Sequence, residues 1–333
     1  MTRCKALSEL IPQNADCVLI ENPVSRRYFT GFYSSDGMLA VTREYGVFGV
    51  DGRYIEAAKE KISDINVALV SNYADFLKEI LKKLSVKRVC VEGSTPASRL
   101  ERLRTLCPDA EFVWEPSLDE GIKRLRMCKD GVEIRRIIEA QRLTDLAFTH
   151  ICDFIRPGVT ERDVALELDY FMKKQGAEKE SFDTIAVSGR RTSMPHGVPT
   201  QKEIEKGDFV TMDFGAVVDG YHSDMTRTIA VGFATEKMEE VYGTVLKAQK
   251  AGISALCPGV RCSEADKICR DIITDTVNFS PIPQVTVWDW TSMSFQIFPL
   301  FLPKFLKKEM LSRWNREYTF RENSACGLRT SAE

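Results

Sequence analysis

Apolar and polar residues alternate most clearly over residues 207–228, GDFVTMDFGAVVDGYHSDMTRT. Short apolar runs flank an Asp-Gly pair at residues 219–220, the dipeptide that a two-residue type I′ turn prefers. The pattern therefore predicts a tight β-hairpin. Counting outward from the turn places Gly215 opposite Asp224, and alternation places Asp213 on the same face as Gly215. Asp213 and Asp224 are then diagonal neighbours across the two strands.

The opposite face of this hairpin carries Val210, Met212 and Phe214, which we expect to point into a core. Two carboxylates that converge beside a packed sheet repel each other unless a cation lies between them. A divalent metal ion, or a pair of them, is the natural candidate. A solvated face of a half-exposed antiparallel sheet has the same pattern. The alternation alone leaves both interpretations open.

The first third of the chain alternates two kinds of segment. Apolar runs predict strands at 17–20, 46–50 and 88–91, and helical periodicity predicts helices at 73–84 and 96–106. Residues 27–32 and 38–42 bracket a polar turn at 34–37. Strands that alternate with helices favour an α/β domain.

The following part reads as helix pairs around a strand region. Residues 130–155 predict a long helix that stops at the Pro-Gly pair 157–158, and Thr160 offers an N-cap with an acidic first turn. Further helices are expected at 236–256 and 263–274. No internal repeat is apparent. Helix pairs that flank an antiparallel sheet indicate an α+β domain.

Composition narrows the class of protein. The 333 residues are 44% hydrophobic and 28% charged, with a net charge of −2. This balance predicts no nucleic-acid partner and no binding to an anionic membrane. We see no signal peptide and no apolar run of membrane-spanning length, and the ten cysteines include no Cys-x-x-Cys pair. We therefore expect a cytoplasmic protein with free thiols.

Two stretches carry a family resemblance. Residues 212–228, MDFGAVVDGYHSDMTRT, resemble the first metal-ligand motif of the pita-bread metallopeptidases, in particular the Xaa-Pro aminopeptidases and dipeptidases. Residues 188–200, SGRRTSMPHGVPT, resemble the substrate-site motif of the same family. The resemblance implies that Asp213 and Asp224 are metal ligands, with Asp224 bridging two metals. It implies that His196 contacts the substrate or the developing oxyanion.

The resemblance also extends to the domains. It implies a creatinase-type N-terminal domain over residues 1–125 and the N-terminal half of a pita-bread catalytic domain over 126–276. It further implies two divalent ions, Mn²⁺ or Co²⁺, proline-containing peptides as substrates and a homodimer. His222, two residues before Asp224, is a candidate for substrate contact, and a surface histidine is the alternative.

Two other functions share this scaffold. A creatinase-type amidinohydrolase has both domains but uses no metal, and the two aspartates argue against it. A non-catalytic binding protein is the third candidate, because some pita-bread proteins keep the scaffold and lose the ligands.

The complete family site needs a histidine and two glutamates beyond the hairpin. Residues 277–333 contain no histidine and a single glycine, so the tail does not resemble the second half of a strand-rich catalytic domain. We therefore expect this chain to bind metal weakly and to lack peptidase activity. The tail is interpreted as an aberrant segment, and the catalytic domain as truncated.

The genetic code offers a reason. If one nucleotide is missing near codon 275, each original codon combines the third base of one present codon with the first two of the next. Residues 288–294 then force Gly-Leu-Asp and allow Val-His-Glu. Residues 284–287 allow Gly-His-Gly, 314–319 force Glu and allow Pro-Gly-Ile-Tyr, and 327–330 allow Ile-Glu-Asp. These segments resemble the family's remaining motifs, in the family's order.

We predict that residues 277–333 are a frameshifted translation of the missing half of the site. Sequencing the coding DNA tests this directly. The alternative frame after about codon 275 should stay open through Gly-His-Gly, Val-His-Glu, Glu-Pro-Gly and Ile-Glu-Asp. A stop codon before the last of these motifs would rule the frameshift out.

Overall fold

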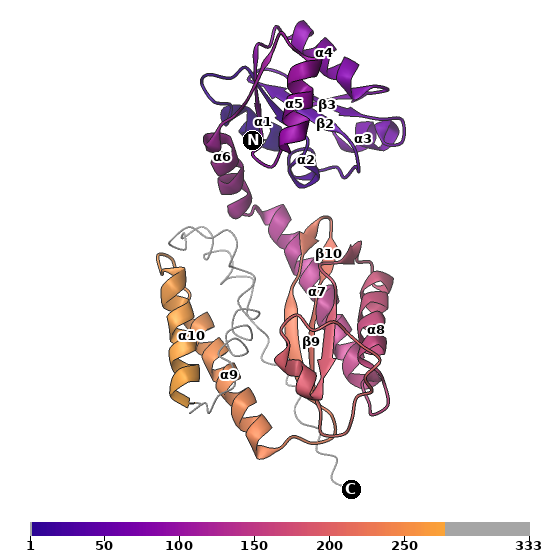
Figure 1. The fold of residues 1–333 in the computed structure, drawn as a ribbon, viewed down its shortest axis with the longest axis vertical. Coiled ribbons are helices and arrows are strands. Elements are labelled where there is room, and N and C mark those ends of the chain that lie inside the picture. The colour runs from indigo at the N-terminus through magenta and orange to yellow at the C-terminus, as the bar shows by residue number, and fades with distance from the viewer. Residues whose placement is uncertain (1, 277–333) are drawn as a thin grey trace. The chain divides into compact units, whose positions relative to one another are not determined.

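The computed structural model describes residues 2–276. The chain divides into two compact units, Met1–Arg126 and Met127–Glu333 (Figure 1). The predictions for residues 277–333, including the shifted frame, lie outside the described residues. Among the helices of the described part, none is long and apolar enough to cross a membrane.

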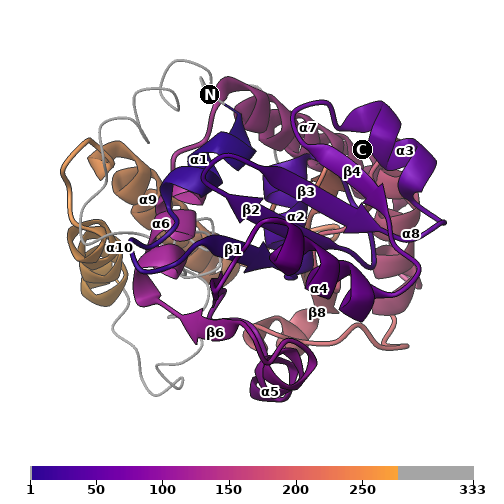
Figure 2. The same ribbon diagram turned by 90° about the horizontal axis from the view of Figure 1, so that it is seen from above.

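The first unit is built on one six-stranded sheet. Its strands are β1 (Cys17–Ile20), β2 (Met38–Thr42), β3 (Gly46–Val50), β4 (Asn66–Leu69), β5 (Arg88–Val91) and β6 (Glu111–Trp114). Its helices are α1 (Arg3–Glu9), α2 (Pro23–Thr30), α3 (Ile55–Lys61), α4 (Tyr73–Lys83), α5 (Ala97–Leu106) and α6 (Pro116–Met127). The strand order is β4-β3-β2-β1-β5-β6 (Figure 2). Strand β2 runs antiparallel to both neighbours, and the other pairs are parallel. The predicted α/β class is confirmed.

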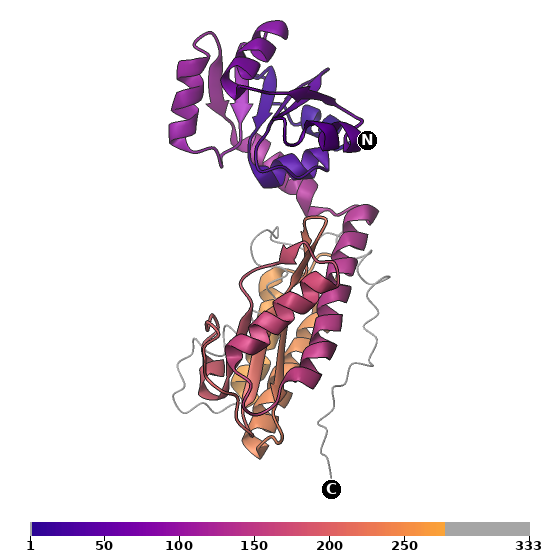
Figure 3. The ribbon, with the colours of Figure 1, turned by 90° about the vertical axis from the view of Figure 1, so that its right-hand side faces the viewer.

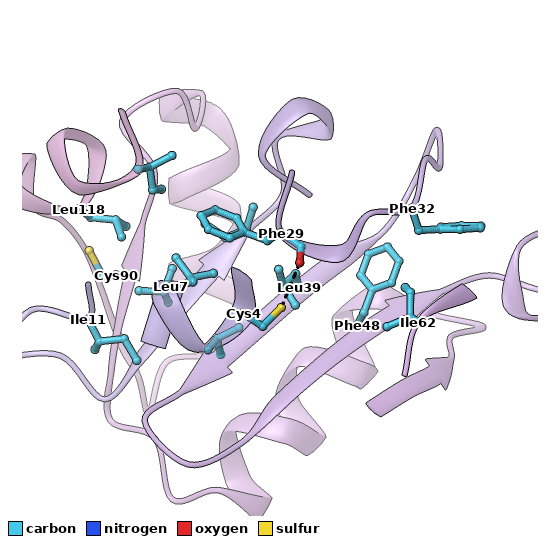
Figure 4. Packing of buried hydrophobic residues seen from close by; sticks show 14 of the residues in the cluster. Cys4, Leu7, Ile11, Phe29, Phe32, Leu39, Phe48, Ile62, Cys90 and Leu118 are labelled. Carbon is cyan, nitrogen blue, oxygen red and sulfur yellow. Dashed lines mark hydrogen bonds between the residues drawn. The ribbon is translucent and has the colours of Figure 1, made fainter. Parts of the chain in front are cut away.

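Both faces of this sheet are buried. Alternate residues of β1 enter two apolar clusters on opposite faces, as the period of two requires. One cluster joins Cys4 of α1 and Phe29 of α2 to Leu39 and Phe48 of the sheet (Figure 4). The Cys4 thiol donates a hydrogen bond to the carbonyl of Phe29 at 3.3 Å. The other cluster includes Leu77 of α4, so helices cover the sheet on both sides.

Helix α2 occupies part of a segment that the sequence pattern placed beside a turn. The Asn22 side chain accepts hydrogen bonds from the backbone N–H groups of Val24 and Ser25, and Pro23 stands at the first helical position. Gly31, with φ 68°, ends the helix in the left-handed conformation. These caps outweigh the strand-like composition of residues 27–32.

The second unit begins with two helices against small sheets. Its elements are α7 (Gly131–Phe154), α8 (Glu161–Lys174), β7 (Lys179–Glu180), β8 (Ile185–Ser188), the 3₁₀ turn η1 (Gly189–Ser193), β9 (Phe209–Phe214), β10 (Ala216–Val218), β11 (Tyr221–His222), β12 (Met225–Ala230), α9 (Glu236–Ala255) and α10 (Cys262–Thr276). Helices α7 and α8 run side by side and pack against the strands (Figure 3). The expected α+β arrangement is confirmed.

The predicted hairpin has the predicted register. Val217 pairs with His222 and Val218 with Tyr221, around a turn in which Asp219 and Gly220 both have positive φ. The ribbon nevertheless breaks at Gly215. Beyond it, β9 and β12 belong to a sheet of order β12-β9-β8, whereas β10 and β11 form a second sheet with β7.

Gly215 is required at the break by its neighbour's backbone. A Cβ atom at this position would lie 2.1 Å from the carbonyl oxygen of Ser223. Behind the break, the Ser223 hydroxyl accepts or donates a hydrogen bond with Thr144 of α7 and accepts one from the backbone N–H of Ala216. The glycine therefore permits close backbone approach, which the sequence pattern had not indicated.

The two helix pairs close in the same way. The segments between α7 and α8 and between α9 and α10 both contain Pro-Gly-Val, at residues 157–159 and 258–260. The glycines have φ of 89° and 94°, and in both turns the valine N–H donates to the carbonyl three residues earlier, at 3.2 Å. The two helix pairs therefore share one local turn geometry.

We predict that Gly215→Ala destabilises the second unit by about 3 kcal/mol or more, because the added methyl group meets backbone that cannot move aside. Gly243→Ala, in the interior of α9 with open space around it, should instead stabilise by about 0.5–1 kcal/mol. Urea unfolding of both variants measures the pair of effects. Equal effects of the two substitutions would contradict the proposed role of Gly215.

Candidate metal centre

Asp213 lies near the end of β9, the central strand of its sheet. Asp213 as a whole is 3% exposed to solvent. Thr226, directly opposite on β12, donates a hydrogen bond from Oγ1 to Asp213 Oδ1 at 2.8 Å. Two pairs further along, on the same face of the sheet, the hydroxyl oxygens of Thr211 and Thr228 lie 2.9 Å apart. Hydroxyl groups thus border the carboxyl group on its own face of the sheet.

The other face of β9 forms the apolar core. Val210, Met212 and Phe214 are fully buried there and belong to one cluster with residues of α7 and α8. The predicted inward direction of these three side chains is confirmed. The core fixes β9 between two strands, and this fixes the direction in which Asp213 points.

Asp224 occupies the break between β11 and β12. Its carboxyl group lies within hydrogen-bonding reach of that of Asp213. Burial, followed by the charge and the hydrogen bond of Asp213, raises the pKa of Asp224 to about 7. Burial also raises the pKa of Asp213, against the opposing effect of the hydrogen bond from Thr226. Without a cation, the two groups therefore share a proton near neutral pH.

His196 lies in the segment between η1 and β9 and is exposed. It is close enough to Asp213 for its charge to favour the ionised carboxylate. His222 is exposed on β11, in the sheet on the other side of the break. The structure thus brings Asp213, Asp224 and His196 into one neighbourhood, and the role of His222 stays a prediction.

One buried carboxylate of the second unit was missed. Glu161 was interpreted as part of an acidic first turn, yet its side chain is 0% exposed. It accepts hydrogen bonds from Ser188, Arg191 and Thr200, which lie 27 to 39 residues further along the chain. No local pattern could have indicated these contacts, because their donors come from a different part of the sequence.

The donor set suits a hard divalent cation but is short of a full coordination shell. Two carboxylates lie together, and oxygen ligands are what Mn²⁺ and Mg²⁺ prefer. Within residues 2–276, no group of three or more His, Cys, Asp or Glu side chains is placed to hold a metal ion. The pair therefore fits part of a metal site, and further ligands are needed to complete it.

Family models match both units. The first matches the Creatinase/Prolidase N-terminal domain over residues 3–128, and the second matches Metallopeptidase family M24 over residues 135–293. The latter match includes the carboxyl pair and the His196 segment.

Two relatives have similar sequences over most of the chain. The chain is 38% identical to an uncharacterized peptidase, YqhT, of Bacillus subtilis, over 78% of this chain and 73% of the relative. It is 38% identical to a Xaa-Pro dipeptidase of Pyrococcus furiosus, over 82% of this chain and 77% of that protein.

Solved structures show the same fold. A Xaa-Pro dipeptidase from Bacillus anthracis superposes with a TM-score of 0.77 at 37% identity, covering 82% of this chain and 77% of the other. An X-Pro aminopeptidase from Thermotoga maritima gives a TM-score of 0.76 at 32% identity, covering 81% and 77%. From its two domains and these relatives, the chain belongs to metallopeptidase family M24, with a creatinase-like N-terminal domain before a pita-bread catalytic domain.

Proposed function

We propose that this protein, with its reading frame restored, is a metal-dependent exopeptidase that removes an N-terminal residue preceding proline. The observation that carries the proposal is the contact between the buried carboxyl group of Asp213 and the half-buried carboxyl group of Asp224. Burying two like-charged groups together is costly unless a cation or a proton compensates them. A hydrolase that uses divalent metal ions gives this arrangement a purpose.

Each residue of the site has a distinct part. Asp213 and Asp224 would hold two ions, Mn²⁺ or Co²⁺, with Asp224 shared between them. Such ions, when bound, lower the pKa of water and polarise a scissile carbonyl. The Thr226 hydroxyl fixes one oxygen of Asp213 and so limits rotation of the ligand. His196 would contact the substrate or donate a hydrogen bond to the developing oxyanion.

The wider assignment follows the family. Proline-containing peptides are the proposed substrates, and the proposed assembly is a cytoplasmic homodimer. We place the domain limits near residues 125 and 276. This chain as written would bind metal weakly and turn over no peptide, because two carboxylates leave most of the coordination of an ion to water.

Two alternatives make different demands on the same residues. A creatinase-type amidinohydrolase would act without metal, so chelation would leave its activity unchanged. A non-catalytic binding protein would retain peptide affinity without turnover, even after the reading frame is restored. The Asp213–Asp224 contact favours the metal-dependent enzyme over both.

We predict that restoring the reading frame by one nucleotide produces Mn²⁺-dependent cleavage of Xaa-Pro dipeptides. In that protein Asp224→Asn should abolish turnover, because a ligand shared by two ions has no substitute. Asp219→Asn is the matched control: it changes an exposed carboxylate in the turn of the same hairpin and should leave turnover unchanged. Hydrolysis that persists in Asp224→Asn, or that survives removal of metal by a chelator, would refute the metal-dependent function.

A second prediction concerns this chain without metal. The folded pKa of Asp224 lies above its unfolded value, so the stabilisation present at pH 4 is lost as the pH rises through about 7. Asp224→Asn removes that loss and should stabilise the chain at pH 8 by on the order of 2 kcal/mol, with little effect at pH 4.

The control for this measurement is Asp163→Asn. The pKa of Asp163 is lowered by its hydrogen bonds with Thr160, so its contribution has the opposite sign and its loss should not stabilise the chain at pH 8. Urea unfolding at the two pH values gives the comparison. If Asp224→Asn and the unsubstituted chain have equal free energies of unfolding at pH 8, the contact between the two carboxyl groups does not destabilise the chain.

A further inference from the structure

One carboxylate outside the proposed metal site is more completely enclosed than either metal-site aspartate. Glu161, the first residue of α8, accepts hydrogen bonds at Oε1 from the backbone N–H of Ser188, at 2.8 Å, and from the Ser188 hydroxyl, at 3.2 Å. At Oε2 it accepts them from the backbone N–H of Thr200, at 3.1 Å, and from the Thr200 hydroxyl, at 2.7 Å. Arg191 Nε adds contacts to both oxygens, at 3.2 and 3.1 Å.

These donors are the two ends and one interior residue of a single segment. Ser188 ends β8 and Thr200 precedes β9, so Glu161 joins the two ends of residues 188–200. Arg191 extends the network by donating from Nη2 to the carbonyl of Val198 at 2.8 Å. His196 lies between these fixed points, in the part of the segment that is exposed.

The second helix pair shows that the turn itself does not require Glu161. The Pro-Gly-Val turns at 157–159 and 258–260 have the same hydrogen bond and nearly the same glycine φ. Cys262 stands where Glu161 stands in the first turn. The turn geometry itself therefore does not require a carboxylate at this position, and the hydrogen bonds of Glu161 go instead to residues 188–200.

The charge of Glu161 agrees with this role. Burial alone would raise its pKa, but the hydrogen bonds from Thr200 and Ser188, together with the charge of Arg191, lower it. An ionised carboxylate accepts hydrogen bonds about twice as strong as a neutral acceptor does. Glu161 is thus an ionised acceptor enclosed by donors from one segment.

We propose that Glu161 is the positioning residue for His196. Its hydrogen bonds hold the two ends of residues 188–200 together, so that His196 stays beside the Asp213–Asp224 pair. The functional meaning of that position rests on the proposed peptidase activity. The mechanical part, an anchored segment, does not depend on it and can be measured on this chain without metal.

The first test uses NMR and trypsin on the 333-residue chain with isotope-labelled histidine. The chain has three histidines, and His196→Gln identifies the signal of His196. In Glu161→Gln the side-chain NH₂ group would face the N–H and O–H donors that bind the carboxylate in the unsubstituted chain. The segment should then gain motion, and the His196 ring signal should sharpen. Tryptic cleavage after Arg190 should accelerate by about tenfold or more.

Matched variants separate positioning from general stability. Asp163→Asn weakens the capping box of the same helix turn and should leave the His196 signal and the cleavage rate unchanged. Thr200→Val keeps the shape of the side chain but removes the hydroxyl that donates to Glu161 and accepts from the backbone N–H of Lys202. It should accelerate cleavage to a smaller extent, and it decides the question if Glu161→Gln does not fold. An unchanged His196 signal and cleavage rate in folded Glu161→Gln or Thr200→Val would overturn the proposal.

A kinetic test addresses the function that this position serves. In the frame-restored protein, Glu161→Gln should lower kcat by about tenfold, with KM and bound metal per chain little changed. A loss of bound metal instead would assign Glu161 to the metal site and overturn the positioning role. If the frame-restored parent itself has no activity, the proposed function fails, and the NMR and proteolysis results alone decide whether Glu161 anchors the segment.

Discussion

The contact between the carboxyl groups of Asp213 and Asp224 is the constraint on which the second unit depends. Two acidic groups do not remain together in a buried place unless the surrounding structure holds them there. Here the apolar core behind β9 fixes one of them, and the break of the ribbon at Gly215 fixes the other. The same packing that stabilises the sheet thus holds two acidic groups in contact.

The break in the ribbon gives the site its shape. A continuous hairpin would carry Asp213 and Asp224 as ordinary diagonal neighbours on a flat face. The close approach of Ser223 to Gly215 divides the ribbon between two sheets, and Asp224 sits at the junction, outside regular pairing. Residues outside regular ladders are free to turn a side chain toward a ligand, which is a common reason for irregularities near functional sites.

The repeated helix pairs show how a general scaffold becomes specific. Both pairs close through Pro-Gly-Val with the same local geometry, so the turn is a structural unit that the sequence uses twice. The first copy adds a glutamate that contacts residues 188–200, and the second carries a cysteine instead. The proposed positioning role of Glu161 would thus come from a single side chain added to a common turn, in keeping with the general rule that functional sites are added to existing folds.

The sequence by itself determined the features whose information is local. The Asp219-Gly220 turn and the alternation around it are sufficient for the register of the hairpin, and with it for the shared face of Asp213 and Asp224. Caps such as Thr160 are sufficient for helix starts. The family motifs around Asp213 and His196 can likewise be recognised within short stretches. The proposed shift of frame rests on the genetic code and concerns residues outside the described part.

Only the tertiary structure decided the rest. The reason for Gly215 became visible only with the carbonyl of Ser223 beside it. The donors to Glu161 lie 27 to 39 residues away, on a strand end and a connecting segment. Local sequence encodes turns, caps and faces, whereas contacts between distant segments arise from packing. The proton-sharing acids and the enclosed glutamate are products of that packing.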